Sequence, residues 1–355
     1  MKPHSSHSAP FLIILGMLLV IGLIFVFDSS GPESANMYGS PYALTIQHLI
    51  GMAVGFVALL AGILTPPKLL LRLGPVLYGV GVLLLALVFA PGIGLSLNGA
   101  HRWLLIAGVS FQPVEFFKFA LIVYMSSWLT THQKLSSFII TVAPAAVLLL
   151  LQPDLGSLLV VLAIACSMFV IAGGSMRKLG ILAATGIPFL IIMIAIAPYR
   201  LARVTTFLNP DADPLGAGFH VRQITLALGR GGLLGQGLGN SSQKFSYVPE
   251  ASTDSIAAII GEETGFVGLL VVIGLYIALL HAGRRLLQPL EGSLHLLGVG
   301  ILTWICVQAL LNLSAVAALV PLTGVPLPFI SYGRSSLVML LYSVGIVLRL
   351  RKTQL

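Results

Sequence analysis

Long apolar runs fill most of the chain, and short polar connections separate them. An α-helix needs roughly 20 apolar residues to cross a bilayer. Ten runs approach that length, at residues 10–27, 43–64, 69–90, 114–130, 138–151, 157–172, 179–197, 255–281, 292–319 and 330–348. The pattern therefore predicts an all-α polytopic membrane protein with about ten transmembrane helices, which form a single transmembrane domain over residues 1–355.

One connection is much longer than the others. Residues 198–254 are largely polar and separate the seventh apolar run from the eighth. We expect this stretch to form one large extracytoplasmic loop. Residues 10–27 resemble the apolar core of a signal peptide but lack a convincing small-residue cleavage site, so they are interpreted as a retained first span.

Composition and charge support this class and orient the chain. Hydrophobic residues make up 57% of the sequence and charged residues 8%, and the mean hydropathy is +1.02, values that a soluble domain does not reach. Eleven of the 19 Lys and Arg residues fall in the terminal segments and alternate connections on one side of the ten-span pattern. Cytoplasmic loops carry this excess, so both termini are predicted inside. No basic patch interleaved with aromatic residues suggests a nucleic-acid partner.

Two charged residues open the fourth apolar run. Glu115 and Lys118 are spaced i and i+3, which places both side chains on one helix face as an ion pair. The pair either neutralises itself within the membrane, or Lys118 faces an anionic substrate group. The segment before it, from Asn98 to Trp103, contributes Arg102 as a second candidate for such contacts.

Other polar positions have expected structural roles. Asp154 precedes an apolar run and is predicted to cap the helix that follows. The prolines near 321–328 break the helical pattern before Ser331, and non-helical backbone at this depth is tolerated where it lines a polar cavity. Cys166 and Cys306 lie inside apolar runs and are interpreted as packing residues.

Asp254 is the strongest candidate for chemistry. It ends the long polar stretch directly before an apolar run, where a carboxylate is costly to hold and is a functional-site hypothesis by default. An N-cap role at the start of the next helix is the alternative. Glu262 and Glu263 lie two turns further along, where polar partners or water must reach them.

These motifs together resemble the SEDS family of bacterial cell-wall polymerases. Six ordered segments carry the resemblance, at 98–103, 112–118, 152–156, 247–254, 261–265 and 326–333. One departure is Arg334, where the family usually has a glycine. Asp154-Leu155-Gly156 and the short amino-terminal tail favour the RodA branch, which serves cell elongation and shape, over the FtsW branch, which serves division.

The resemblance implies a peptidoglycan glycosyltransferase of the bacterial cytoplasmic membrane. Its substrate would be lipid II, an undecaprenyl-pyrophosphate-linked disaccharide peptide, polymerised on the outer face. Asp254 would be the general base of an inverting transfer. The resemblance also implies two kinds of partner, a class B penicillin-binding protein with transpeptidase activity and the elongation machinery.

The expulsion of a pyrophosphate requires cations that stabilise its charge. The candidates are Arg102, Lys118, Arg200, Arg203 and Lys244. Glu115, Asp154, Glu250, Glu262 and Ser331 are expected to support the cavity. A Mg²⁺ or Mn²⁺ ion could share this work, although no ligand cluster in the sequence predicts a metal site. A lipid II flippase is the alternative function, because ten spans around a polar cavity also suit a transporter.

Overall fold

A computed structural model describes residues 8–97, 100–106, 108–196, 198–212, 218–245 and 248–352. Its α-helices are α1 (Ser8–Tyr38), α2 (Ala43–Leu64), α3 (Pro67–Leu87), α4 (Pro113–Trp128), α5 (Leu135–Leu151), α6 (Leu155–Ile171), α7 (Met176–Ile196), α8 (Pro198–Leu208), α9 (Phe219–Gly231), α10 (Ile256–Leu287), α11 (Gly292–Val316) and α12 (Arg334–Lys352). The strands are β1 (Gly94–Leu97), β2 (Ala100–Ile106) and β3 (Val109–Phe111). A helix occupies each of the ten predicted apolar runs, which confirms the all-α membrane class.

Five of these helices are long and apolar enough to cross a membrane by length and composition alone, namely α1, α2, α3, α10 and α11. The helices α5 and α6 are apolar but shorter. The class is therefore clear, and the count of ten spans stays a prediction. The first helix is longer than expected, because it continues past residue 27 to Tyr38.

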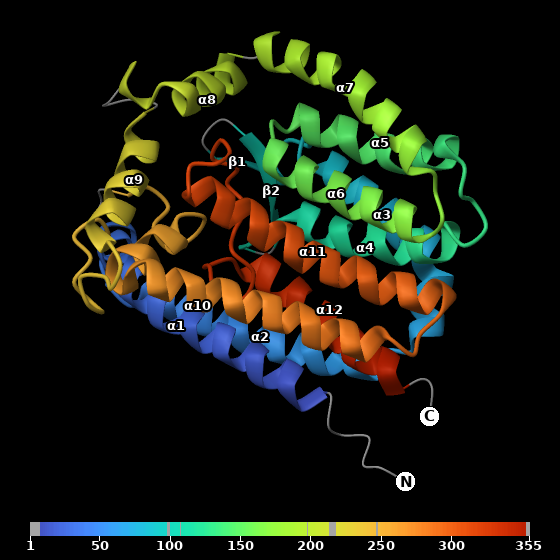
Figure 1. The fold of residues 1–355 in the computed structure, drawn as a ribbon, viewed down its shortest axis with the longest axis horizontal. Coiled ribbons are helices and arrows are strands. Elements are labelled where there is room, and N and C mark those ends of the chain that lie inside the picture. The colour runs from blue at the N-terminus through green and yellow to red at the C-terminus, as the bar shows by residue number, and fades with distance from the viewer. Residues whose placement is uncertain are drawn as a thin grey trace.

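The helices form one bundle around a shared apolar core (Figure 1). In Figure 1, α10 and α11 run side by side across the molecule, with α1 and α2 along one side and α4 to α6 along the other. Close packing joins α2 to α12, where a Cβ on Gly345 would lie 2.2 Å from the carbonyl oxygen of Leu59. Small residues allow this approach, as they do between transmembrane helices in general.

Two parts of the fold were not anticipated. The connection before α4 folds into a small antiparallel sheet of order β1-β2-β3, in which Leu104 lies opposite both Gly94 and Phe111. The long polar connection contains α8, α9 and a 3-10 turn at Pro210–Ala212, so it is a folded layer over one end of the bundle. Both features contribute walls to the candidate site.

Candidate active site

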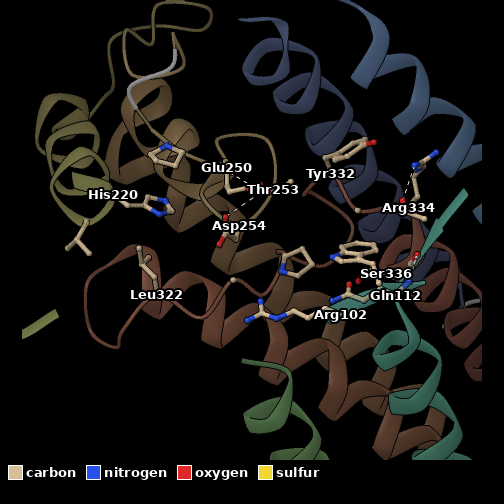
Figure 2. Close-up of a pocket in the computed structure, with 18 of the residues that line it drawn as sticks. Arg102, Gln112, His220, Glu250, Thr253, Asp254, Leu322, Tyr332, Arg334 and Ser336 are labelled. Atoms are coloured by element: carbon tan, nitrogen blue, oxygen red, sulfur yellow. Dashed lines mark hydrogen bonds between the residues drawn. The ribbon is translucent and has the colours of Figure 1, made fainter. Parts of the chain in front are cut away.

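A cavity of about 640 Å³ opens at the end of the bundle where the sheet, α8 and α9 meet. Its walls come from β2, β3, α8, α9, the turn before α10, the connection before α12 and the first turn of α12. The lining residues used below are Arg102, Ser110, Gln112, His220, Glu250, Thr253, Asp254, Gly324, Pro326, Tyr332, Arg334, Ser335 and Ser336. Segments far apart in the sequence therefore build one polar site (Figure 2).

Asp254 lies in the wall of this cavity and is half-buried. The hydroxyl of Thr253 is 3.4 Å from Asp254 Oδ1 and donates to Glu250 Oε2 at 2.8 Å, so it bridges the two carboxylates. The N-cap residue of α10 is Ser255, and Asp254 precedes it by one residue. The choice between a catalytic and a capping role for Asp254 stays a prediction.

The amide of Asn312 holds the Asp254 turn from behind. This side chain is 1% exposed, and its Nδ2 donates to the carbonyl oxygens of Asp254 at 2.7 Å and Val325 at 2.8 Å. One turn earlier on α11, Gln308 Nε2 donates to the carbonyl of Pro326 at 3.0 Å. The same face of α11 thus joins two walls of the cavity, the Asp254 turn and the segment before α12.

Two arginines line the cavity without a carboxylate partner among the residues described. Arg102 donates through Nη2 to the carbonyl of Pro153, and its Nε is buried with no hydrogen bond. Arg334 is the first residue of α12 and donates through Nη2 to Ser110 Oγ at 3.3 Å. Neither guanidinium lies within 4.0 Å of a described carboxylate, so their charge is available to an anion in the cavity.

His220 also lines the cavity, and sequence reasoning missed it. It lies on the first turn of α9, and its Nε2 is 2.8 Å from Ser255 Oγ. In Figure 2, Asp254 lies between His220 on one side and Arg334 with Gln112 on the other. A lone histidine in a polar loop carries no sequence signal that would have selected it.

The remaining predicted cations divide into two groups. Lys118 is 1% exposed, pairs with Glu115 at 2.8 Å and donates to Gln308 Oε1 at 2.8 Å. Lys244 pairs with Asp28 at 2.6 Å and Glu263 at 3.3 Å. Neither lysine lines the cavity, so the expectation that they contact substrate is not supported by their placement.

Arg200 and Arg203 belong to α8, and their side chains lie outside what the structure describes. The helix itself contributes to the cavity through Ala202, Thr206 and Phe207.

The predicted supporting residues lie in three places. Asp154 caps α6 as expected, since its Oδ1 accepts from the Ser157 amide at 3.1 Å. Ser331 Oγ accepts from the Leu327 amide at 2.8 Å and so stabilises the turn before α12. Glu262 does not line the cavity; it accepts from the hydroxyl of Ser241 and organises the connection before α10.

No three His, Cys, Asp or Glu side chains gather as a metal site within the described part of the chain. The two cysteines are free and half-buried. The most suitable oxygen ligands in the cavity are Glu250 and Asp254, which Thr253 bridges.

Comparisons with known proteins identify the family of the chain. Residues 9–354 match the family described as "Cell cycle protein", whose members are FtsW, RodA and SpoVE. The chain belongs to this SEDS family. It is 37% identical to the probable peptidoglycan glycosyltransferase FtsW of Coxiella burnetii over 97% of this chain and 96% of that protein.

Two solved structures share the fold. A chain of a peptidoglycan synthase complex that coordinates polymerization and crosslinking is 27% identical and superposes with a TM-score of 0.79, over 96% of both chains. The rod shape determining protein RodA of Thermus thermophilus is 25% identical with a TM-score of 0.69, over 96% of this chain and 95% of that one. As a member of this family the chain is a multi-pass membrane protein and a glycosyltransferase.

Proposed function

We propose that this glycosyltransferase polymerises lipid II into glycan strands, with Asp254 as the general base. The observation that carries the proposal is a carboxylate in a polar cavity that is also lined by two arginines without carboxylate partners among the described residues. The family relationship to proteins named peptidoglycan glycosyltransferase supports the substrate class.

The reaction is a single displacement at the anomeric carbon of the donor sugar. Asp254 accepts the proton of the acceptor 4-hydroxyl as the new carbon–oxygen bond forms. The bond from the anomeric carbon to the pyrophosphate breaks, and its electron pair leaves on the phosphate oxygen. A glycosidase needs a second carboxyl to protonate its leaving group, whereas a pyrophosphate departs as an anion when cations stabilise it.

The proposal includes location, branch and partners. The cavity faces the outer side of the cytoplasmic membrane, where the translocated lipid is available. We assign the chain to the elongation branch on Asp154-Leu155-Gly156. Cells depleted of the protein should then become rounded, and cells that instead grow into filaments would contradict this assignment. The resemblance to a chain of a peptidoglycan synthase complex supports a class B penicillin-binding protein as partner, which co-purification after mild crosslinking tests. A requirement for Mg²⁺ or Mn²⁺ stays a prediction.

Purified protein in detergent tests the proposal against the flippase alternative. A micelle does not separate two compartments, so a flippase has no measurable activity there. We expect wild-type protein to convert lipid II into glycan strands. Asp254→Asn keeps the shape of the side chain but removes the basic oxygen, so the rate should fall by about 10²–10⁴-fold. The matched control is Asp211→Asn, an exposed carboxylate of the same connection that pairs with Arg222. Normal polymerisation by Asp254→Asn would overturn the assignment of the base.

A further inference from the structure

The cavity is electrically divided. Glu250 and Asp254 lie together on one side, bridged by the Thr253 hydroxyl. Figure 2 shows Arg334 and Ser336 on the other side, away from Asp254 and His220. Within the described residues that side contributes guanidinium, hydroxyl and amide groups to the wall, and no carboxylate. Such a wall favours an anionic ligand.

Arg334 is the cationic residue of this wall. It is the first residue of α12, so its guanidinium lies at the positive end of a 19-residue helix. A cation there is disfavoured by about 0.3–1 kcal/mol, whereas an anion is stabilised. A guanidinium has five N–H donors, and the structure assigns one of them, Nη2, to Ser110 Oγ at 3.3 Å. The position is therefore electrostatically unfavourable until an anion binds beside it.

The backbone of the first turn of α12 also favours an anion beside Arg334. The first amide of α12 that closes a helical hydrogen bond is that of Leu337, which donates to the carbonyl of Gly333 at 2.9 Å. The preceding amides are the ones that a helix N-terminus leaves for other acceptors. Ser335 Oγ accepts from the Gln112 amide at 3.2 Å, which ties the first turn of α12 to the start of α4. The turn that carries Arg334 is thus fixed in place.

We propose that Arg334 binds the diphosphate of the donor lipid. This inference rests on the proposed function and identifies the leaving-group end of the same cavity. Inversion places the attacking oxygen and the leaving oxygen on opposite sides of the anomeric carbon. Since Asp254 takes the proton of the attacking hydroxyl, the diphosphate that receives the electron pair must lie across the cavity from Asp254. Arg334 lies there.

The test compares Arg334→Gln, Arg334→Lys and the control Arg285→Gln, an exposed arginine in the last turn of α10. Two lipids separate the donor from the acceptor. Labelled lipid II with a blocked 4-hydroxyl can only donate, and an unblocked lipid II analogue, in which a methylene group replaces the oxygen between the sugar and the diphosphate, can only accept. Initial rates of labelled product are measured while each lipid is varied at a saturating concentration of the other.

We expect Arg334→Gln to raise the half-saturating concentration of the blocked donor about tenfold or more, because the variant loses one or two charge-assisted hydrogen bonds to the diphosphate. The value for the unblocked acceptor should change less than about twofold. Inorganic pyrophosphate, as a competing anion, should inhibit Arg334→Gln about tenfold less strongly than wild type. Arg334→Lys should recover part of each effect, because lysine keeps the charge but not the planar fork.

Unchanged donor saturation in a folded Arg334→Gln protein would overturn the inference, as would a shift in acceptor saturation alone. Thermal unfolding midpoints identify a variant that is merely unfolded, and Arg334→Lys then carries the comparison. A wild-type protein that makes no glycan would contradict the proposed function itself. If the wild-type protein polymerises normally and Arg334→Gln has the same donor saturation as the control Arg285→Gln, this inference alone is contradicted.

Discussion

A single buried amide fixes the backbone of Asp254. Asn312 donates to the carbonyls of Asp254 and Val325 and is 1% exposed. Asn312→Ala leaves two carbonyls without their donor, at a cost of about 1–3 kcal/mol for each that stays buried and unsatisfied. We expect kcat for glycan synthesis to fall at least about tenfold while KM stays within about twofold. The Asp254 turn loses its donor, whereas Arg102 keeps its contact with Pro153 and Arg334 keeps its contact with Ser110.

Steady-state kinetics in detergent measure that division between kcat and KM. The control is Asn240→Ala, which removes an exposed amide bonded to the Gln236 carbonyl. Asn312→Ser retains a donor and should recover part of kcat. A lower unfolding midpoint in Asn312→Ala with unchanged kcat would show that Asn312 stabilises the fold without positioning the base.

Single residues also show what the sequence could predict about the site. The i,i+3 spacing of Glu115 and Lys118 predicted an ion pair, and the 2.8 Å contact confirms it. Whether Lys118 also reaches the substrate depended on Gln308, which lies 190 positions away in the chain and accepts from its Nζ. The spacing of residues along the sequence predicts contacts within one helix, but it does not predict contacts with residues of a different helix.

At the scale of elements, α10 is interrupted where the connection before it folds back. Gly265 has φ 68° and ψ −167° inside the helix. A Cβ at this position would lie 2.4 Å from the amide nitrogen of Gly235 and 2.5 Å from the carbonyl oxygen of Leu233, both backbone atoms. Gly265→Ala should therefore lower the thermal unfolding midpoint in detergent, with a cost of roughly 1–3 kcal/mol from the backbone conformation.

Gly274 provides a control on the same helix. A Cβ there would meet nothing within 4 Å, and alanine favours helix over glycine by about 0.8–1.0 kcal/mol. Gly274→Ala should leave the midpoint unchanged or raise it slightly. Equal shifts in the two variants would show that the contact between Gly265 and the preceding connection does not matter for stability.

The ten apolar runs predicted helices because a membrane-spanning helix requires a long, continuously apolar segment. Both properties can be recognised within a single stretch of sequence. The helices α8 and α9 escaped that criterion, since they lie in a stretch interpreted as a polar loop. The strands β1 to β3 are three to seven residues long and pair with their immediate neighbours, so no apolar periodicity distinguished them. The cavity walls from these elements could not be predicted for that reason.

At the scale of the whole molecule, alternate connections meet at one end of the bundle. Arg102 of β2 donates to the carbonyl of Pro153 before α6, and Lys244 pairs with Asp28 of α1. The amide of Tyr332, before α12, donates to the Ser252 carbonyl at 2.8 Å. A chain that crosses a membrane at each predicted run brings these connections to the same side, so their contacts support the alternation on which the predicted topology depends.

The orientation of that end can be measured with single cysteines in a background that lacks Cys166 and Cys306. Asn36 and Asn240 are exposed near the end that carries the cavity, and Ser136 is exposed at the start of α5. Because cytoplasmic loops carry the excess of Lys and Arg, an impermeant thiol reagent should label Asn36→Cys and Asn240→Cys in intact cells. Ser136→Cys should be labelled only after the membrane is permeabilised, which also shows that its thiol is reactive. Labelling of Ser136→Cys alone in intact cells would reverse the orientation and place the cavity on the cytoplasmic side, where a polymerase of translocated lipid II could not work.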